Sequence, residues 1–197
     1  MNPKWIAALW LSIGLLFGAQ NGTVKHGSCG VERWAVKTLQ DPQGSAVYRT
    51  QIIQSSVPVL TNIPAHPKSE LLALEDSRLS PWETTVYEVH AVVIGFKHET
   101  DQDFHIVIAD PQNLKDTMIV EIPAGECVGP VNAARFAALQ AQFEKDFGHA
   151  TAKFKTLPKP VPVDVVGVGF FDFIHGQTGV APNGFELHPV LAIGRNE

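Results

Sequence analysis

Between residues 85 and 193, three strands with alternating apolar residues are followed by one amphipathic helix and then by two further strands. This order of elements is typical of a five-stranded OB-fold barrel. The preceding segment, residues 21–82, has no sustained periodicity and is interrupted repeatedly by proline. The sequence therefore predicts a mainly β protein with one helix, in which an N-terminal extended arm packs on an OB-fold-like barrel at residues 83–197.

The first predicted strand covers residues 85–93 and has a period of two. Its apolar face is continuous, whereas Glu88 and His90 lie on the opposite face, as expected of a half-buried strand. Gly95 follows shortly after it. We expect a β-bulge there, because the first strand of a small barrel must bend sharply to pair on both of its sides.

Four further strands are predicted from the same alternation and from the turn residues between them. They cover residues 104–109, 117–122, 161–171 and 185–193. Residues 153–160, which are rich in Lys and Pro, are expected to connect the helix to the fourth strand. Pro189 makes the fifth strand an edge or bulged strand, since proline cannot donate a hydrogen bond to a central ladder.

One long helix is predicted between Pro130 and Gly148. Proline favours the first helical position, and glycine favours the position just after the last turn. The apolar face contains Phe136, Leu139, Phe143 and Phe147. These spacings place one stripe of side chains toward the core, so the helix is expected to cover one end of the barrel.

The N-terminus has the pattern of an export signal. One Lys at position 4 precedes an apolar run at residues 5–17, and small and polar residues follow. The run is shorter than the roughly 20 residues that a membrane-spanning helix needs. We therefore expect residues 1–20 to be a cleaved signal peptide, with a retained anchor as the alternative. The mature protein would be periplasmic or extracellular, without a membrane span.

Cys29 and Cys127 are the two cysteines of the chain. In an oxidising compartment such a pair predicts one disulfide, which in the chain-entropy model stabilises the fold by about 4 to 5 kcal/mol. Neither cysteine has the CxxC spacing of a redox or zinc site. The bond is expected to join the start of the arm to the barrel.

The overall charge excludes one class of function. The formal net charge is −5, and removal of residues 1–20 with their single Lys leaves −6. This balance argues against a strongly basic nucleic-acid-binding or polybasic membrane module. With 45% hydrophobic and 18% charged residues, the chain has the composition of an ordinary folded protein.

Two polar loops are the predicted binding edge. In an OB-fold barrel the loops after the first and the fourth strand flank the ligand face, and here these are residues 97–103 and 173–184. The expected contact residues are Lys97, Asp101, Asp103, His105, His175, Gln177 and Asn183. The ligand is left open among a glycan, a protein and an oligonucleotide.

A divalent metal is the one cofactor that the residue types allow. Asp103 with His105, and Glu186 with His188, are each two residues apart and share a strand face. The metal-ligand candidates are Asp103, His105, His175 and His188. No HExxH or EF-hand spacing is present, so a solvated acidic hairpin whose histidines bond to backbone carbonyls is the alternative.

Catalytic motifs give little support for an enzyme. GxSxG, SxxK and GxxxxGK[ST] are absent, and the arginines at 33, 49, 78, 135 and 195 all lie outside the two loops. A nuclease would use such arginines to stabilise the charge on the phosphoryl group. The sequence favours a binding module. The alternatives are a metal-dependent hydrolase of the nuclease or phosphodiesterase type and a structural envelope or surface protein.

Four segments carry a resemblance to known sequences. They are CGVERWAVKTLQD at 29–41, the pattern KxExDxDxH at 97–105, TMIVEIP at 117–123 and GFFDFIHGQTGVAPNGFELHP at 169–189. Together they resemble a group of uncharacterised exported bacterial proteins with an OB-fold-like barrel. The resemblance implies export and a barrel and transfers no catalytic residue. The strand at 105–111 is similar to one in staphylococcal-nuclease-like domains, from which the chain departs by lacking the loop arginines.

Overall fold

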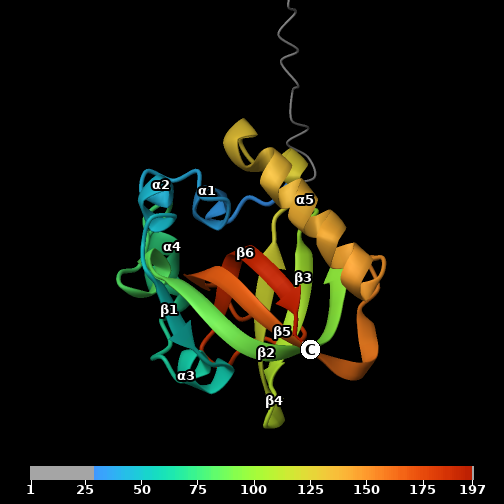
Figure 1. The fold of residues 1–197 in the computed structure, drawn as a ribbon. Helices are drawn as coiled ribbons and strands as arrows, with labels where there is room; N and C mark the ends of the chain where they lie inside the picture. Colours follow the sequence, from blue (N-terminus) through green and yellow to red (C-terminus); the bar gives the residue numbers. More distant parts are fainter. Residues whose placement is uncertain (1–28, 197) are drawn as a thin grey trace, which may run out of the picture.

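The computed structural model describes residues 29–196, so the expected signal peptide at residues 1–20 lies outside the described part of the chain. Residues 29–196 form a mainly β protein with six strands in one mixed sheet and one long helix (Figure 1). Within this range no helix is both long enough and apolar enough to cross a membrane.

The elements follow in the order shown in Figure 1. The strands are β1 Ile52–Ser55, β2 Val86–His98, β3 Phe104–Asp110, β4 Asn113–Ile122, β5 Lys155–Phe171 and β6 Phe185–Arg195. The helices are α1 Trp34–Lys37, α2 Gly44–Val47, α3 Val57–Thr61, α4 Lys68–Ala73 and α5 Pro130–Phe147. Two short 3-10 turns complete the set, η1 Trp82–Thr84 and η2 Gly125–Cys127.

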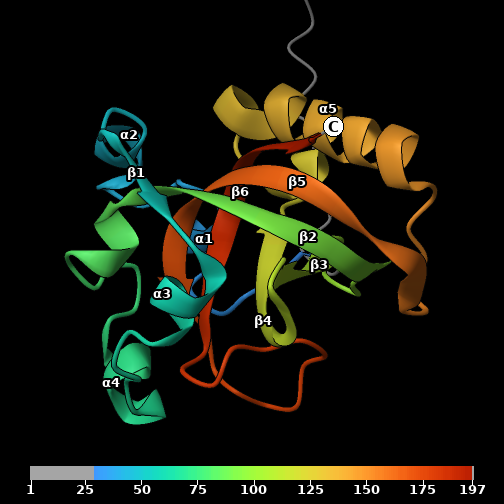
Figure 2. The same cartoon turned by 60° about the horizontal axis from the view of Figure 1, so that its bottom comes forward.

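The strand pairings form a ring. The sheet order is β1-β2-β3-β4-β6-β5, and β5 also pairs with β2. The neighbours within the ring are antiparallel except for β4 and β6, which are parallel. Figure 2 shows β2 and β5 running side by side across the molecule. The sheet has six strands where the sequence predicted five, because β1 from the arm pairs in parallel with the start of β2.

The predicted bulge in the first ring strand is present. The register of β2 shifts between Val93 and Gly95 against both neighbours. A Cβ atom at Gly95 would lie 2.6 Å from the Phe154 ring and 2.8 Å from the Lys155 carbonyl oxygen. Only glycine therefore allows β5 to approach this closely where β2 bends.

The prediction that residues 153–160 only connect the helix to the next strand is wrong, because β5 already begins at Lys155. The pairing of β5 with β2 moves from Thr156 opposite Gly95 directly to Val161 opposite Val93. The two prolines of this stretch, at 158 and 160, lie in the interval without a β2 partner. A strand can hold proline there because no ladder hydrogen bond is lost.

The predicted bulge in the last strand is also found. Between Val166 and Gly169 the register of β5 against β6 shifts twice, and Pro189 lies in β6 at that irregularity. The strand continues past it to Arg195. The edge or bulged strand expected from this proline is thus a bulged one.

Helix α5 has the predicted ends, beginning at Pro130 and ending at Phe147, with Gly148 at a φ of 88° after it. Its aromatic face is buried in the main core. The Phe143 ring packs edge-on against Phe96, with ring centroids 5.0 Å apart. Figures 1 and 2 both show α5 lying across one side of the strands.

The arm is more helical than expected, since α1 to α4 are all short helices. Short helices form here because buried contacts hold them. Arg33 makes two hydrogen bonds to the Glu83 carboxylate, at 2.8 and 2.6 Å. Arg78 does the same with Asp41, at 2.9 and 2.6 Å. These buried pairs fix the arm to itself and to the start of the ring.

The predicted disulfide is present. Cys29 and Cys127 are bonded across 98 residues of sequence, with their Cα atoms 5.4 Å apart. Cys29 is the first described residue of the arm and Cys127 ends η2, shortly before α5. The bond thus joins the start of the arm to the segment between β4 and α5.

Candidate functional site

A pocket of about 390 Å³ lies between the arm and the sheet. It is bounded by the start of the arm, the β2–β3 loop, the β5–β6 loop and side chains of β3, β4 and β6. The lining residues at its floor are His105, Ile119, Glu121 and Glu186. The two loops that the sequence predicted as a binding edge both contribute to it.

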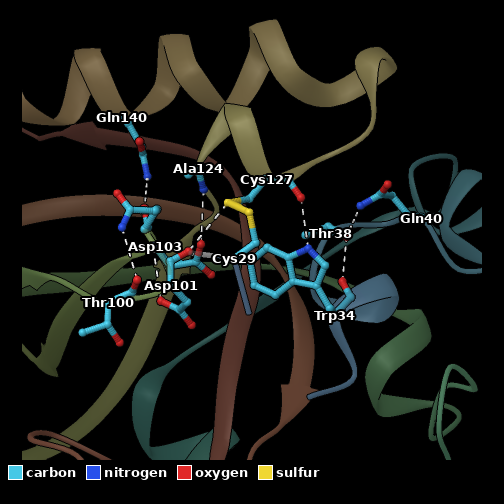
Figure 3. The surroundings of a disulfide bond; sticks show 11 residues. Cys29, Trp34, Thr38, Gln40, Thr100, Asp101, Asp103, Ala124, Cys127 and Gln140 are labelled. Atoms are coloured by element: carbon cyan, nitrogen blue, oxygen red, sulfur yellow. Dashed lines mark hydrogen bonds between the residues drawn. A yellow bond between two sulfur atoms is a disulfide. The ribbon is translucent and has the colours of Figure 1, made fainter. Parts of the chain in front are cut away.

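The disulfide holds Cys29, at the start of the residues of the arm that line this pocket, next to Cys127 (Figure 3). Trp34 lies beside the bond and donates its indole Nε1–H to the Cys127 carbonyl oxygen at 3.0 Å. Gly30 packs directly on the Trp34 ring, where a Cβ atom would come within 2.3 Å. Residues 29–34 are therefore held against the sheet by one covalent bond and by close packing.

Carboxylates dominate the lining. Six of them contribute to the pocket, namely Glu32, Glu99, Asp101, Glu121, Asp172 and Glu186. Lys37 is the one lysine in the lining and lies 3.5 Å from Asp172. Glu32 and Asp101 make no ion pair with any residue between 29 and 196. The pocket therefore has a negative potential at its outer edge.

Charged side chains of β4, of β6 and of the loop before β3 form a buried network, which we call the inner cluster and define as Asp103, Glu121, Glu186 and His188. His105 on β3 lies opposite Glu121 on β4. The Glu121 carboxylate reaches His105 Nδ1 at 3.0 Å with one oxygen and His188 Nδ1 at 3.1 Å with the other. Glu186 lies 3.2 Å from the same His188 nitrogen, and Asp103 lies 3.3 Å from His188 Nε2.

The network shifts the ionisation of its histidines and of Glu121. Burial alone would lower the pKa of His188, but Asp103, Glu121 and Glu186 outweigh burial and raise that pKa well above its usual value. The pKa of His105 is also raised against burial, by Glu121 and by the Thr178 carbonyl. Burial would raise the pKa of Glu121, yet its two histidine partners hold it well below the ordinary range.

The pKa values of the other two carboxylates of the inner cluster are raised, in contrast to that of Glu121. Burial, assisted by Glu121 and Asp172, raises the pKa of Glu186 to about 7. Burial also raises the pKa of Asp103 to about 6, although His188 works against it. Lys37 stays charged, because the surrounding carboxylates raise its pKa above the usual value despite burial. Such shifts are characteristic of functional sites, although structural ion-pair networks also produce them.

Two groups of side chains between residues 29 and 196 could hold a metal ion. Glu99, His105 and Glu121 form the outer group, which lines the pocket, and Asp103, Glu121 and His188 form a fully buried group. In each group the ligand atoms lie within 4.8 Å of one another. The arrangement can thus attract a cationic ligand at the pocket and can hold a proton or a metal ion beneath it.

The sequence-predicted residues fall into three places. Asp103, His105 and His188 meet in or beside the inner cluster. Asp101, His175 and Gln177 line the pocket, although Gln177 also bonds to the Phe173 carbonyl of its own loop. His175 is exposed and belongs to neither metal group.

Lys97 and Asn183 do not line the pocket. Lys97 lies behind Glu99, 2.8 Å from its carboxylate. Asn183 is buried, and its amide nitrogen donates to the carbonyls of Leu60 and Ile63, each at 2.9 Å. This side chain therefore ties the β5–β6 loop to α3 and the turn after it.

Several site residues were missed by sequence reasoning. Glu121 is a lone carboxylate within the buried half of β4, in TMIVEIP. A charge at an inward position of an apolar strand was the signal that could have found it. Lys37 gives the same kind of signal, because it is a charged residue in the mainly apolar sequence WAVKTL. No sequence pattern indicates that Glu32 and Asp172 line the same pocket, because this depends on how the arm packs against the sheet.

No protein-family model matches the chain, and comparisons with curated proteins and with solved structures give no significant match. The resemblance to exported bacterial proteins therefore stays a prediction.

Proposed function

We propose that the protein is an exported binding module built on an OB-fold-like barrel, and that its pocket binds a positively charged ligand. The ring of pairings from β2 through β3, β4, β6 and β5 supports the barrel. The Cys29–Cys127 disulfide supports export, since such bonds persist in oxidising compartments. In OB-fold proteins the loops beside the strand face bind the ligand, and this pocket lies between two such loops.

The observation that carries the proposal is the charge of the lining, with six carboxylates against one lysine and two histidines, His105 and His175. That lysine is already close to Asp172, and Glu99 is close to Lys97. Glu32 and Asp101 remain available at the pocket edge. A concave site lined by one sign of charge concentrates the opposite charge, because its walls exclude water and focus the field.

The size and the apolar part of the lining restrict the ligand further. About 390 Å³ is within the range of small-molecule sites. Val31, Trp34 and Ile119 supply apolar surface next to the carboxylates. The pocket therefore fits a small amine or guanidinium compound with a hydrocarbon portion, or one cationic side chain of a bound protein.

The alternatives from the sequence gain less support. The phosphates of an oligonucleotide would be repelled by the carboxylates. A neutral glycan has no charge that could pair with them. No arginine lines the pocket, and within the described chain Arg33 and Arg78 are committed to buried carboxylates. A nuclease or phosphodiesterase would lack the cations that stabilise a phosphoryl transition state.

Isothermal titration calorimetry with two panels of compounds of opposite charge tests the proposal. Agmatine, spermidine and benzamidine form the cationic panel, and glutarate, malate and benzoate form the anionic one. We expect binding from the cationic panel only, weaker at high salt because part of the pocket is exposed. Selective binding of the anionic panel would contradict the proposal.

A pair of variants locates the binding. The double change Glu32→Gln with Asp101→Asn removes two pocket charges, and we expect about tenfold weaker binding. The control, Glu126→Gln with Asp116→Asn, changes the net charge equally but lies outside the lining. Equal weakening by both double variants would show that only the overall charge matters.

A further inference from the structure

The inner cluster contains two buried polar atoms that make no hydrogen bond to any residue of the described chain, Asp103 Oδ2 and His188 Nε2. Both side chains are essentially inaccessible to solvent, at 1% and 0% exposure. The two atoms face each other at 3.3 Å. A carboxylate oxygen opposite an imidazole nitrogen is costly in the interior unless a positive centre lies between them.

The second nitrogen of His188 already has its partners. Nδ1 lies 3.1 Å from a Glu121 oxygen and 3.2 Å from a Glu186 oxygen. Because a carboxylate only accepts, Nδ1 carries the proton and donates it to Glu186 Oε1, which leaves Glu121 free to act as a ligand. A neutral His188 then has its lone pair on Nε2, which lies 3.3 Å from Asp103 Oδ2. Histidines that bind metals are oriented in this way, by a carboxylate that accepts from the other ring nitrogen.

The spacing also fits a metal. Tetrahedral zinc binds nitrogen and oxygen ligands at roughly 2.0 to 2.1 Å, which places two such ligands about 3.3 Å apart. Asp103 holds its other oxygen, Oδ1, toward the Ala124 backbone N–H at 3.2 Å, so its Oδ2 is kept in place. Figure 3 shows this bond beside the disulfide.

We propose that Asp103, Glu121 and His188 bind one divalent metal ion of the zinc class. Their ligand atoms lie within 4.8 Å of one another. Histidine nitrogen and carboxylate oxygen are both zinc ligands, whereas calcium takes six to eight oxygens. The metal site shares Glu121 with the pocket lining, but the assignment does not rest on the cationic ligand proposed above.

The outer group is the weaker location for the metal, because its atoms are already used. His105 Nε2 donates to the Thr178 carbonyl at 2.9 Å, and His105 Nδ1 lies 3.0 Å from Glu121. The Glu99 carboxylate is held by Lys97 at 2.8 Å. A metal there would have to displace a lysine, whereas the buried group has two unused atoms.

Metal content of the full chain, isolated with its disulfide formed, tests this assignment. Elemental mass spectrometry should find about one equivalent of zinc per chain. After chelation, added Zn²⁺ should raise the melting temperature by about 5 °C or more. Folded protein without metal, whose melting temperature does not respond to Zn²⁺ or Mn²⁺, would overturn the proposal and leave a proton on His188 Nε2.

Two matched variants decide between the groups. Asp103→Asn keeps the side-chain shape and should weaken zinc binding about tenfold or more, whereas Glu99→Gln in the outer group should leave it unchanged. The opposite pattern would place the metal in the outer group and overturn the assignment.

If Asp103→Asn does not fold, an anomalous difference map of wild-type crystals decides. A zinc peak between Asp103 and His188 is expected, and a peak at Glu99 would contradict it. Neither result depends on the calorimetric test of the pocket.

Discussion

The side chain of Asn183, a predicted ligand contact, is buried in the structure and holds the backbone of other segments. It stands in a polar loop, in the sequence APNGFELHP, where surface recognition is a reasonable expectation. In the structure its amide holds two carbonyls of the arm, and its oxygen accepts from the Phe185 backbone N–H at 3.0 Å. Sequence reasoning found its polarity but not its burial, because the partners are 120 or more residues away.

We expect Asn183→Ala to lower the free energy of unfolding by about 2 to 3 kcal/mol, because three buried backbone groups lose their partner. Binding of a cationic ligand should not change, since Asn183 does not line the pocket. Urea denaturation and calorimetry measure the two effects. Asn113→Ala, at an exposed position, is the control and should have little effect on stability. A stable variant with lost binding would restore Asn183 to the binding site.

At the scale of elements, local patterns predicted most of the ring. The bounds of α5 follow from Pro130, Gly148 and the spacing of its apolar residues, and the starts of β3 and β6 agree with the predicted strands. The arm was predicted less well. Its short helices and β1 are stabilised by distant partners, such as Glu83 for Arg33. No local periodicity carries that information, so β1 was not predicted to join the sheet.

The bulge of β2 gives a test at this scale. We expect Gly95→Ala to lower the free energy of unfolding by about 1 to 3 kcal/mol, because the new Cβ would press on Phe154 and on the backbone of β5. Gly194→Ala in β6 is the matched control, since nothing lies within 4 Å of a Cβ there. Equal thermal stability of the two variants would mean that β5 does not approach β2 as closely as described.

At the scale of the whole molecule, the candidate site is made by joining two parts of the chain. The sequence predicted the disulfide and the two loops that line the pocket. It did not predict that the start of the arm closes the pocket or that Glu121 links two histidines. Both features depend on packing between segments far apart in the sequence. The disulfide holds the start of the arm in its place at the pocket.

Removal of the disulfide should therefore affect both stability and binding. We expect Cys29→Ser with Cys127→Ser to lower the free energy of unfolding by about 2 to 5 kcal/mol. Affinity for a cationic ligand should fall even at temperatures where the variant is folded, because residues 29–34 lose their covalent link to the sheet. Calorimetry below the melting transition measures this loss. Unchanged affinity in the folded variant would show that the arm is not a wall of the site.

The central claim is that a cation binds between the arm and the two loops. A two-dimensional ¹⁵N–¹H NMR titration of the full chain with agmatine tests it most directly. We expect the largest shifts at backbone amides of Glu32, Asp101 and Gln177, with no comparable shifts at the control positions Asp116 and Glu126. Shifts centred away from these lining residues, or none at millimolar agmatine with the same result for spermidine and benzamidine, would contradict the claim.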